Sequence, residues 1–117
     1  AHAFEASLGY SKKLNHGEAV ILGINTALKF SYKNKFLSSN EYNLIKKHTQ
    51  NSRLPFNIKK YFSLKNLNKI LYFMTKDKKN NSDKINLILL KKIGYPIINK
   101  KYTKNNLNSF LKKELIN

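Results

Sequence analysis

The histidines of this chain are the side chains best suited to hold a metal ion. His16 directly precedes Gly17 and an amphipathic run, and a neutral imidazole placed there can turn into a cleft and bind zinc. Because catalytic zinc normally uses three protein ligands, His16 alone is not a complete site, and a structural or exposed histidine explains the same pattern. His2 lies fourteen positions earlier, too far for the i, i+4 ligand pair of one helix. Two helices joined by a loop could still bring both rings together.

Two glutamates could orient an imidazole by accepting its second ring N–H. Glu5 and Glu18 are both candidates for this orienting role. For Glu18 an equally favoured interpretation is an acid that complements the dipole at the start of a helix. His48 stands beside two lysines and is predicted to be a surface residue without a role.

A lysine-rich run could bind phosphate. Clustered ammonium groups in the 76–79 run, which contains Lys78 and Lys79, would attract a dianion and could close over it. In a chain with 23 basic residues, a solvated charged turn explains the same pattern. The sequence has no Gly-rich phosphate cradle and no Ser/His/Asp arrangement. The residues alone therefore support only a basic helical domain.

The first two predicted helices would position the histidines. The first ends over 2–8 at Gly9, and a polar loop over 9–15 leads into a helix from His16 to about Asn34. Helical spacing predicts an inner stripe on the second helix, made of Val20, Ile21, Ile24, Ala27, Leu28 and Ser31.

Caps and breakers delimit the next helices. Ser38 and Glu41 have the spacing of a capping box, which predicts a helix to about Thr49 and leaves Glu41 no role beyond the cap. Pro55 then interrupts the helical pattern. Ser63 is predicted to cap a further helix. The apolar anchors are Tyr42, Leu44 and Ile45 in the former helix, and Leu64, Leu67, Ile70, Leu71 and Met74 in the latter.

The last third is predicted to contain the only strands. After a polar loop over 75–84, residues 85–90 and 95–98 indicate two short strands joined around Gly94, which form a hairpin. Thr103 can cap a final helix to about Leu115, with Leu107, Phe110 and Leu111 facing inward. We therefore expect one mainly α domain over 1–117, a helical bundle carrying one small β-hairpin.

Composition narrows the class of protein. The 117 residues carry a net charge of +17, but all basic residues except Arg53 are lysine, whereas base readout favours arginine. We attribute the excess of Lys, Asn and Ile to A+T-rich coding, so nucleic-acid binding by a basic helical module is the less favoured alternative, and steep salt dependence of binding would reveal it. The chain has no cysteine and no apolar run near the ~20 residues that cross a bilayer. We expect a cytoplasmic protein without a membrane partner.

Several segments resemble the 3-dehydroquinate synthase family of the sugar-phosphate cyclases. That family carries Gly-His-Ala-x-Glu-Ala, then Gly-Tyr, then Leu-x-His-Gly-Glu-Ala-Val-x-x-Gly. The matching segments here are His2-Ala3-Phe4-Glu5-Ala6, Gly9-Tyr10, Leu14-Asn15-His16-Gly17-Glu18-Ala19-Val20 with Gly23, Arg53-Leu54-Pro55, Met74 with Asp77-Lys78-Lys79, and Leu87-Ile88-Leu89-Leu90 with Ile93-Gly94. The likeness spans nearly the whole chain and is confined to the family's C-terminal helical domain. Ala1 stands where the family usually has glycine, and the loop before His16 is one residue longer than in common members.

The resemblance implies a lyase that converts 3-deoxy-arabino-heptulosonate 7-phosphate to 3-dehydroquinate and phosphate, with zinc (or cobalt) and NAD as cofactors. His16 matches the family's last zinc-ligating histidine. His2 matches a histidine near the substrate phosphate that handles protons and is not a metal ligand. Lys78 or Lys79 matches the lysine that reaches the phosphate, and spacing does not choose between them. No residue of this chain matches a cofactor-binding residue for NAD.

The resemblance also implies what this chain does not supply. The other two zinc ligands and the NAD-binding domain would precede residue 1, so the isolated chain is expected to bind metal poorly and to be inactive. The surface where that domain packs would be apolar and open, and a homodimer is possible. Related sugar-phosphate cyclases share the framework, and metal-dependent glycerol and alcohol dehydrogenases share the His-Gly pair. The Asp-Lys-Lys loop and the Ile-Gly hairpin separate this chain from those dehydrogenases.

Overall fold

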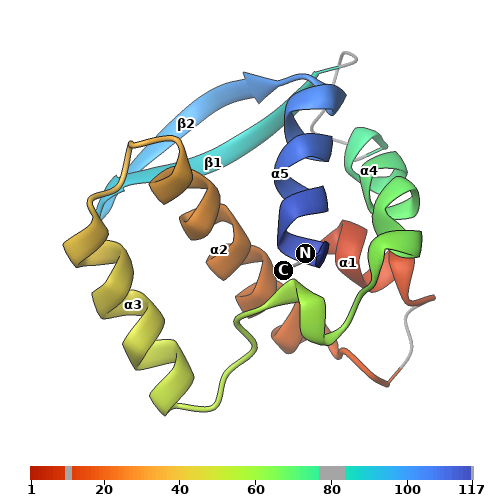
Figure 1. The fold of residues 1–117 in the computed structure, drawn as a ribbon, viewed down its shortest axis with the longest axis horizontal. Coiled ribbons are helices and arrows are strands. Elements are labelled where there is room, and N and C mark those ends of the chain that lie inside the picture. The colour runs from red at the N-terminus through yellow and green to blue at the C-terminus, as the bar shows by residue number, and fades with distance from the viewer. Residues whose placement is uncertain (10–11, 77–83, 117) are drawn as a thin grey trace.

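Helices dominate the described part of the chain. The computed structural model describes residues 1–9, 12–76 and 84–116 (Figure 1). The elements in chain order are α1 (His2–Ser7), α2 (His16–Lys33), α3 (Ser39–Asn51), the 3₁₀ turns η1 (Ile58–Lys60) and η2 (Leu64–Asn66), α4 (Leu67–Thr75), β1 (Ile85–Lys92), β2 (Tyr95–Tyr102) and α5 (Lys104–Ile116). The prediction of a mainly α bundle with one hairpin is confirmed.

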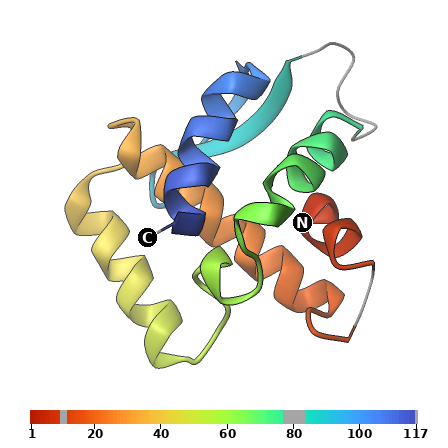
Figure 2. The ribbon, with the colours of Figure 1, turned by 45° about the vertical axis from the view of Figure 1, so that its right-hand side comes forward.

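Helix α2 is the central element of the bundle. It contacts α1, α3 and β1 (Figures 1 and 2), and these contacts bury Ala19, Leu22, Asn25, Leu28, Phe30 and Ser31. The predicted inner stripe is correct at Leu28 and Ser31 but wrong at Ile24, whose side chain is 55% exposed. Because neighbouring elements contact α2 on several sides, they bury more of its surface than one stripe of residues. Ile24 lies on a side of α2 that no described element covers.

Local side-chain bonds start α2 and α3. The Oδ1 atom of Asn15 accepts the Glu18 N–H at 2.8 Å while Glu18 Oε1 accepts the Asn15 N–H at 3.0 Å, a reciprocal capping box. At α3 the Oγ atom of Ser38 accepts the Glu41 N–H at 3.2 Å. The returning half of that predicted box does not form, because Glu41 Oε2 accepts the Ile93 N–H at 2.8 Å. Glu41 therefore ties α3 to the hairpin turn.

Two anchors of the predicted helices are exposed. Leu44 of α3 is 63% exposed, whereas Tyr42 is 4% exposed. Residues two apart on a helix point to nearly opposite sides, and α3 packs on α2 through the side that carries Tyr42. Leu64 is 45% exposed because it lies in the η2 turn before α4 begins, so it does not join the stripe of Leu67, Ile70 and Leu71.

The ends of α2 and α3 use a left-handed residue that is not glycine. Lys35 has a φ of 62°, and its N–H bonds to the Tyr32 carbonyl while the Phe36 N–H bonds to the Ser31 carbonyl. This is the Schellman arrangement, which satisfies the last carbonyls of a helix. Arg53, with a φ of 57°, closes α3 in the same way.

The two strands form an antiparallel hairpin that is longer than predicted. Ile85 pairs with Tyr102, and Gly94 takes a φ of 84° in the turn. The second strand continues past Ile98 to Tyr102, because a two-stranded sheet accepts polar residues on its solvent side. On the outer edge of β1, the Leu90 N–H donates to Ser31 Oγ of α2 at 3.0 Å.

One main core joins α1, α2, α4, β1 and α5. It contains Leu22, Ile70, Leu71, Leu89 and Leu111, each at most 3% exposed. A smaller cluster between α2 and α3 packs Leu28 and Leu37 around Tyr42. At the edge of the core, Lys29 Nζ pairs with Glu114 Oε1 at 2.5 Å. No helix among the described residues is long and apolar enough to cross a bilayer.

Candidate functional site

The first residue of α2 and the middle of α1 meet at a hydrogen bond. His16 Nδ1 lies 2.9 Å from Glu5 Oε1. The Glu5 side chain is 12% exposed and that of His16 is 71% exposed. A carboxylate has no proton to give, so the bond requires a hydrogen on Nδ1 and leaves Nε2 of a neutral ring as the acceptor. The Nε2 atom of His16 is therefore the ring nitrogen that can bind a metal.

Glu5 and Glu18, the two candidate orienting acceptors, take different positions. Glu5 holds the imidazole, whereas the Glu18 carboxylate accepts the backbone N–H of Asn15 in the cap of α2. In this structure Glu18 therefore lies in the capping box. Its charge also reaches Tyr61: burial raises the pKa of the Tyr61 phenol above its usual value, and the Glu18 carboxylate raises it further.

His2 is exposed at the start of α1. Residues three apart on a helix are neighbours on its surface, so His2 lies one turn from Glu5, the partner of His16. The packing of α1 on α2 brings Glu5 to His16, and His2 precedes Glu5 by three residues in the same helix. Lys78 and Lys79 lie outside the described residues. Lys76, the last described residue before them, follows α4 and stands over the Tyr72 ring at 5.6 Å.

Sequence reasoning missed Tyr61. It lies at the end of η1, half-buried, and close enough to the start of α2 for the Glu18 carboxylate to affect its pKa. No local spacing pattern connects residue 61 with residue 18, because the segment after Pro55 returns to α2 only through tertiary packing. His48 is exposed in the last turn of α3, as predicted.

The donor atoms at this junction fit one ligand position of a zinc site. Zinc-bound histidines generally donate their other ring N–H to a carboxylate or carbonyl, and His16 does so to Glu5. Among residues 1–9, 12–76 and 84–116, no three His, Cys, Asp or Glu side chains are grouped to hold a metal. A complete zinc site needs further ligands from outside the described residues.

Comparisons with known proteins agree with the family resemblance described in the sequence analysis. The family model for "3-dehydroquinate synthase C-terminal" matches residues 1–80. The 3-dehydroquinate synthase of Pelagibacter ubique is 57% identical over 115 residues, which cover 98% of this chain and 31% of the relative. The enzyme of the same name from Zymomonas mobilis is 31% identical over 97% of this chain and 30% of its own length. No solved structure matches significantly.

The relatives are longer than this chain. It spans 31% of the Pelagibacter protein, and 26% of the Acinetobacter baylyi 3-dehydroquinate synthase, to which it is 35% identical. The family match covers His2 and the contact between Glu5 and His16, together with α3 and α4. The chain belongs to the 3-dehydroquinate synthase C-terminal family.

Proposed function

We propose that this chain works as the C-terminal part of a 3-dehydroquinate synthase, a lyase that forms 3-dehydroquinate and phosphate from 3-deoxy-arabino-heptulosonate 7-phosphate. The observation that carries the proposal is the 2.9 Å contact between Glu5 and His16, in a chain that matches the family over this region. The reaction, the cofactors and the residue roles are inferred from the relatives, because the chain spans only about a third of their length.

His16 would provide one metal ligand through Nε2. When bound, a zinc or cobalt ion would supply a Lewis acid for substrate hydroxyls, and NAD would supply a reversible oxidant. The hydrogen bond from Nδ1 to the Glu5 carboxylate supports this role, because it would leave Nε2 as the free acceptor of the neutral ring. NAD would bind to parts of the enzyme that this chain does not contain.

His2 and the lysine run would act on the phosphate end of the substrate. The imidazole of His2 would accept and return a proton as a general acid and base. An ammonium group from Lys78 or Lys79 would neutralise part of the phosphate charge. These roles follow the family pattern. A single-turnover assay of His2→Asn, made in the fusion protein described next, would separate proton handling from substrate binding.

The decisive test uses a fusion. The segment of the Pelagibacter enzyme that matches this chain is replaced by this chain, and zinc content and dehydroquinate formation are measured. We expect an active fusion, with His16→Ala losing both zinc and activity and His48→Ala, a surface histidine, losing neither. Full zinc content in the His16→Ala fusion would contradict the proposed ligand.

The isolated chain is a second test. With one metal ligand and no NAD-binding part, it should show no turnover in a coupled assay with substrate, NAD and zinc, and no tight stoichiometric zinc binding by calorimetry. Clear turnover would contradict the proposal. Product analysis of the fusion would reveal a different carbocycle if the chain comes from another sugar-phosphate cyclase. A homodimer and a cytoplasmic location belong to the same proposal, and sedimentation of the fusion tests the former.

A further inference from the structure

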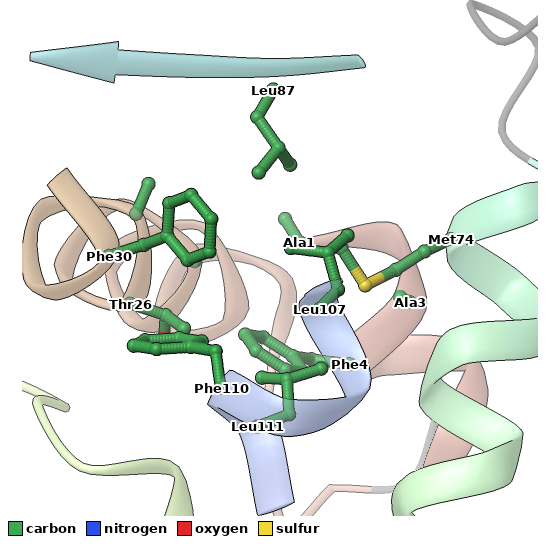
Figure 3. Close-up of a pocket in the computed structure, with 12 residues that line it drawn as sticks. Ala1, Ala3, Phe4, Thr26, Phe30, Met74, Leu87, Leu107, Phe110 and Leu111 are labelled. Carbon is green, nitrogen blue, oxygen red and sulfur yellow. The ribbon is translucent and has the colours of Figure 1, made fainter. Parts of the chain in front are cut away.

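Two apolar hollows meet at the first residue of the chain. The first, of about 150 Å³, lies among α1, α2, α4, α5 and β1 (Figure 3), where Leu87 of β1 points toward Phe30 of α2 and Leu107 of α5. The second, of about 570 Å³, lies between α2 and the hairpin. Both are lined by Ala1, Gly23 and Ala27, so they adjoin at the N-terminus of α1.

The second hollow exposes large aliphatic side chains. Ile24 of α2 is 55% exposed and Ile88 of β1 is 62% exposed, and both line it together with Val20, Leu28 and Pro96. Single exposed isoleucines are common on protein surfaces, but two in one apolar depression indicate a contact site. We define the α2–hairpin face as Val20, Ile24, Leu28, Ile88 and Pro96.

The main chain enters the fold at this face. A Cβ atom added to Gly23 would lie 3.1 Å from the Ala1 nitrogen, so the backbone passes directly over α2 at that point. In a protein as long as the relatives, the preceding polypeptide is bonded to the Ala1 nitrogen. That polypeptide therefore reaches this domain at the point where the two hollows adjoin. The Ala1 side chain has no acceptor to cap α1, and the helix can continue upstream without disturbing a cap.

We propose that the α2–hairpin face is where the rest of a 3-dehydroquinate synthase packs on this domain, beginning with the segment joined to Ala1. This inference rests on the proposed function. About two thirds of the Pelagibacter protein lies outside the part that this chain matches, which is ample to cover the face. A nucleic-acid partner does not suit the face, because isoleucine and proline side chains carry no charge that could neutralise phosphate groups.

The absence of cysteine allows a direct test by thiol labelling. Ile24→Cys and Ile88→Cys are made in the isolated chain and in the fusion with the remaining Pelagibacter segment, and their rates of reaction with a maleimide are compared. We expect both to react rapidly in the isolated chain and at least tenfold more slowly in the fusion. Leu44→Cys, 63% exposed on α3, should react rapidly in both, and Ala19→Cys, 0% exposed, slowly in both. The fusion without an added cysteine gives the background.

The outcomes separate this inference from the proposed function. Equal rates for Ile24→Cys and Ile88→Cys in chain and fusion would overturn the packing face, even in an active fusion. Slowed labelling in an inactive fusion would support the face and count against the proposed function. Protection that rises with concentration of the isolated chain would show that a second copy covers the face, which also overturns the inference.

Discussion

The carboxylate of Glu5 and the imidazole of His16 lie 2.9 Å apart although eleven positions separate them. The carboxylate is on the buried side of the contact and the imidazole on the exposed side. A buried partner of fixed position can orient an exposed ring, whereas an exposed partner would move with it. The orientation of His16 therefore depends on the packing of α1 against α2.

The first prediction concerns the tautomer of His16. Replacing Glu5 by leucine removes the acceptor but keeps an apolar body in a buried position. The ratio of Nδ1-protonated to Nε2-protonated neutral ring should fall about tenfold, because a hydrogen bond to a charged group contributes at least ~1.4 kcal/mol. Nitrogen-15 NMR of histidine-labelled protein, recorded where the ring is neutral, measures this ratio.

Glu18→Gln is the matched control for that experiment. Its side chain accepts the Asn15 N–H and does not contact the ring, so the tautomer ratio of His16 should stay unchanged. If Glu18→Gln shifts the ratio as much as Glu5→Leu does, the orienting role belongs to the charge near α2 and not to the Glu5 contact.

Local sequence patterns predict where the helices start, but they do not predict which side chains meet through tertiary contacts. The Ser38 and Thr103 caps were predictable because a hydroxyl and the N–H three residues on are fixed by one turn of chain. The second role of Glu41 was not, since its partner Ile93 is 52 positions away. Ile24 was misassigned for the same reason: periodicity identifies an apolar residue but not whether a neighbour covers it.

The second prediction concerns the bond between α2 and the hairpin. Ser31 is 0% exposed, and its hydroxyl accepts the Leu90 N–H. Ser31→Ala leaves this N–H without its acceptor, which should lower the free energy of unfolding by about 1–3 kcal/mol. Urea denaturation measures the loss, and hydrogen exchange should become faster at Leu90.

Ser7→Ala provides the comparison. Ser7 is also buried, but within the described part of the chain its hydroxyl bonds only to the Ala3 carbonyl of its own helix. That carbonyl belongs to the helical ladder, so the substitution should change stability by no more than about 0.5 kcal/mol. Equal losses for Ser7→Ala and Ser31→Ala would show that the Leu90 contact adds nothing.

The third prediction is a loss of stability in alkali. Burial, assisted by the Glu114 carboxylate and by Tyr32, raises the pKa of Tyr42 from 10.0 to about 12. As pH rises from 10 to 12 the unfolded chain ionises Tyr42 while the folded chain does not. The contribution of Tyr42 to the free energy of unfolding is thus complete below about pH 10, and about 2–3 kcal/mol of it is lost by pH 12. Denaturation of wild type against Tyr42→Phe across this range isolates the effect from the lysines.

Two variants divide the causes of this shift. The Tyr42 hydroxyl is buried without a hydrogen-bond partner among the described residues, so Tyr42→Phe should be neutral or stabilising at pH 7. Glu114→Gln removes the second cause and should lower the pKa of Tyr42 only in part, because burial is the larger cause. If the pKa of Tyr42 returned to 10 in Glu114→Gln, the carboxylate and not burial would be the larger cause.

The candidate site shows the same division between local and tertiary information. His16 and Glu5 stand out as residue types, and both were candidates from the sequence. Which glutamate meets the ring depends on how α1 folds back on α2, and the cap of α2 engages Glu18 first. Tyr61 joins this region only because the segment after Pro55 returns to α2, which no spacing rule predicts.

The last prediction concerns the left-handed residue that ends α2. Lys35 has a φ of 62°, where a residue with a Cβ is disfavoured by about 1–2 kcal/mol relative to glycine. Lys35→Gly removes that strain but costs about 0.5–1 kcal/mol through the greater entropy of the unfolded chain, so we expect a net stabilisation of up to about 1.5 kcal/mol. Lys33→Gly, at the last helical residue of α2, should instead destabilise by up to about 1 kcal/mol. Thermal and urea unfolding of both variants give the comparison, and a destabilised Lys35→Gly would mean that the lysine side chain contributes more than its backbone strain removes.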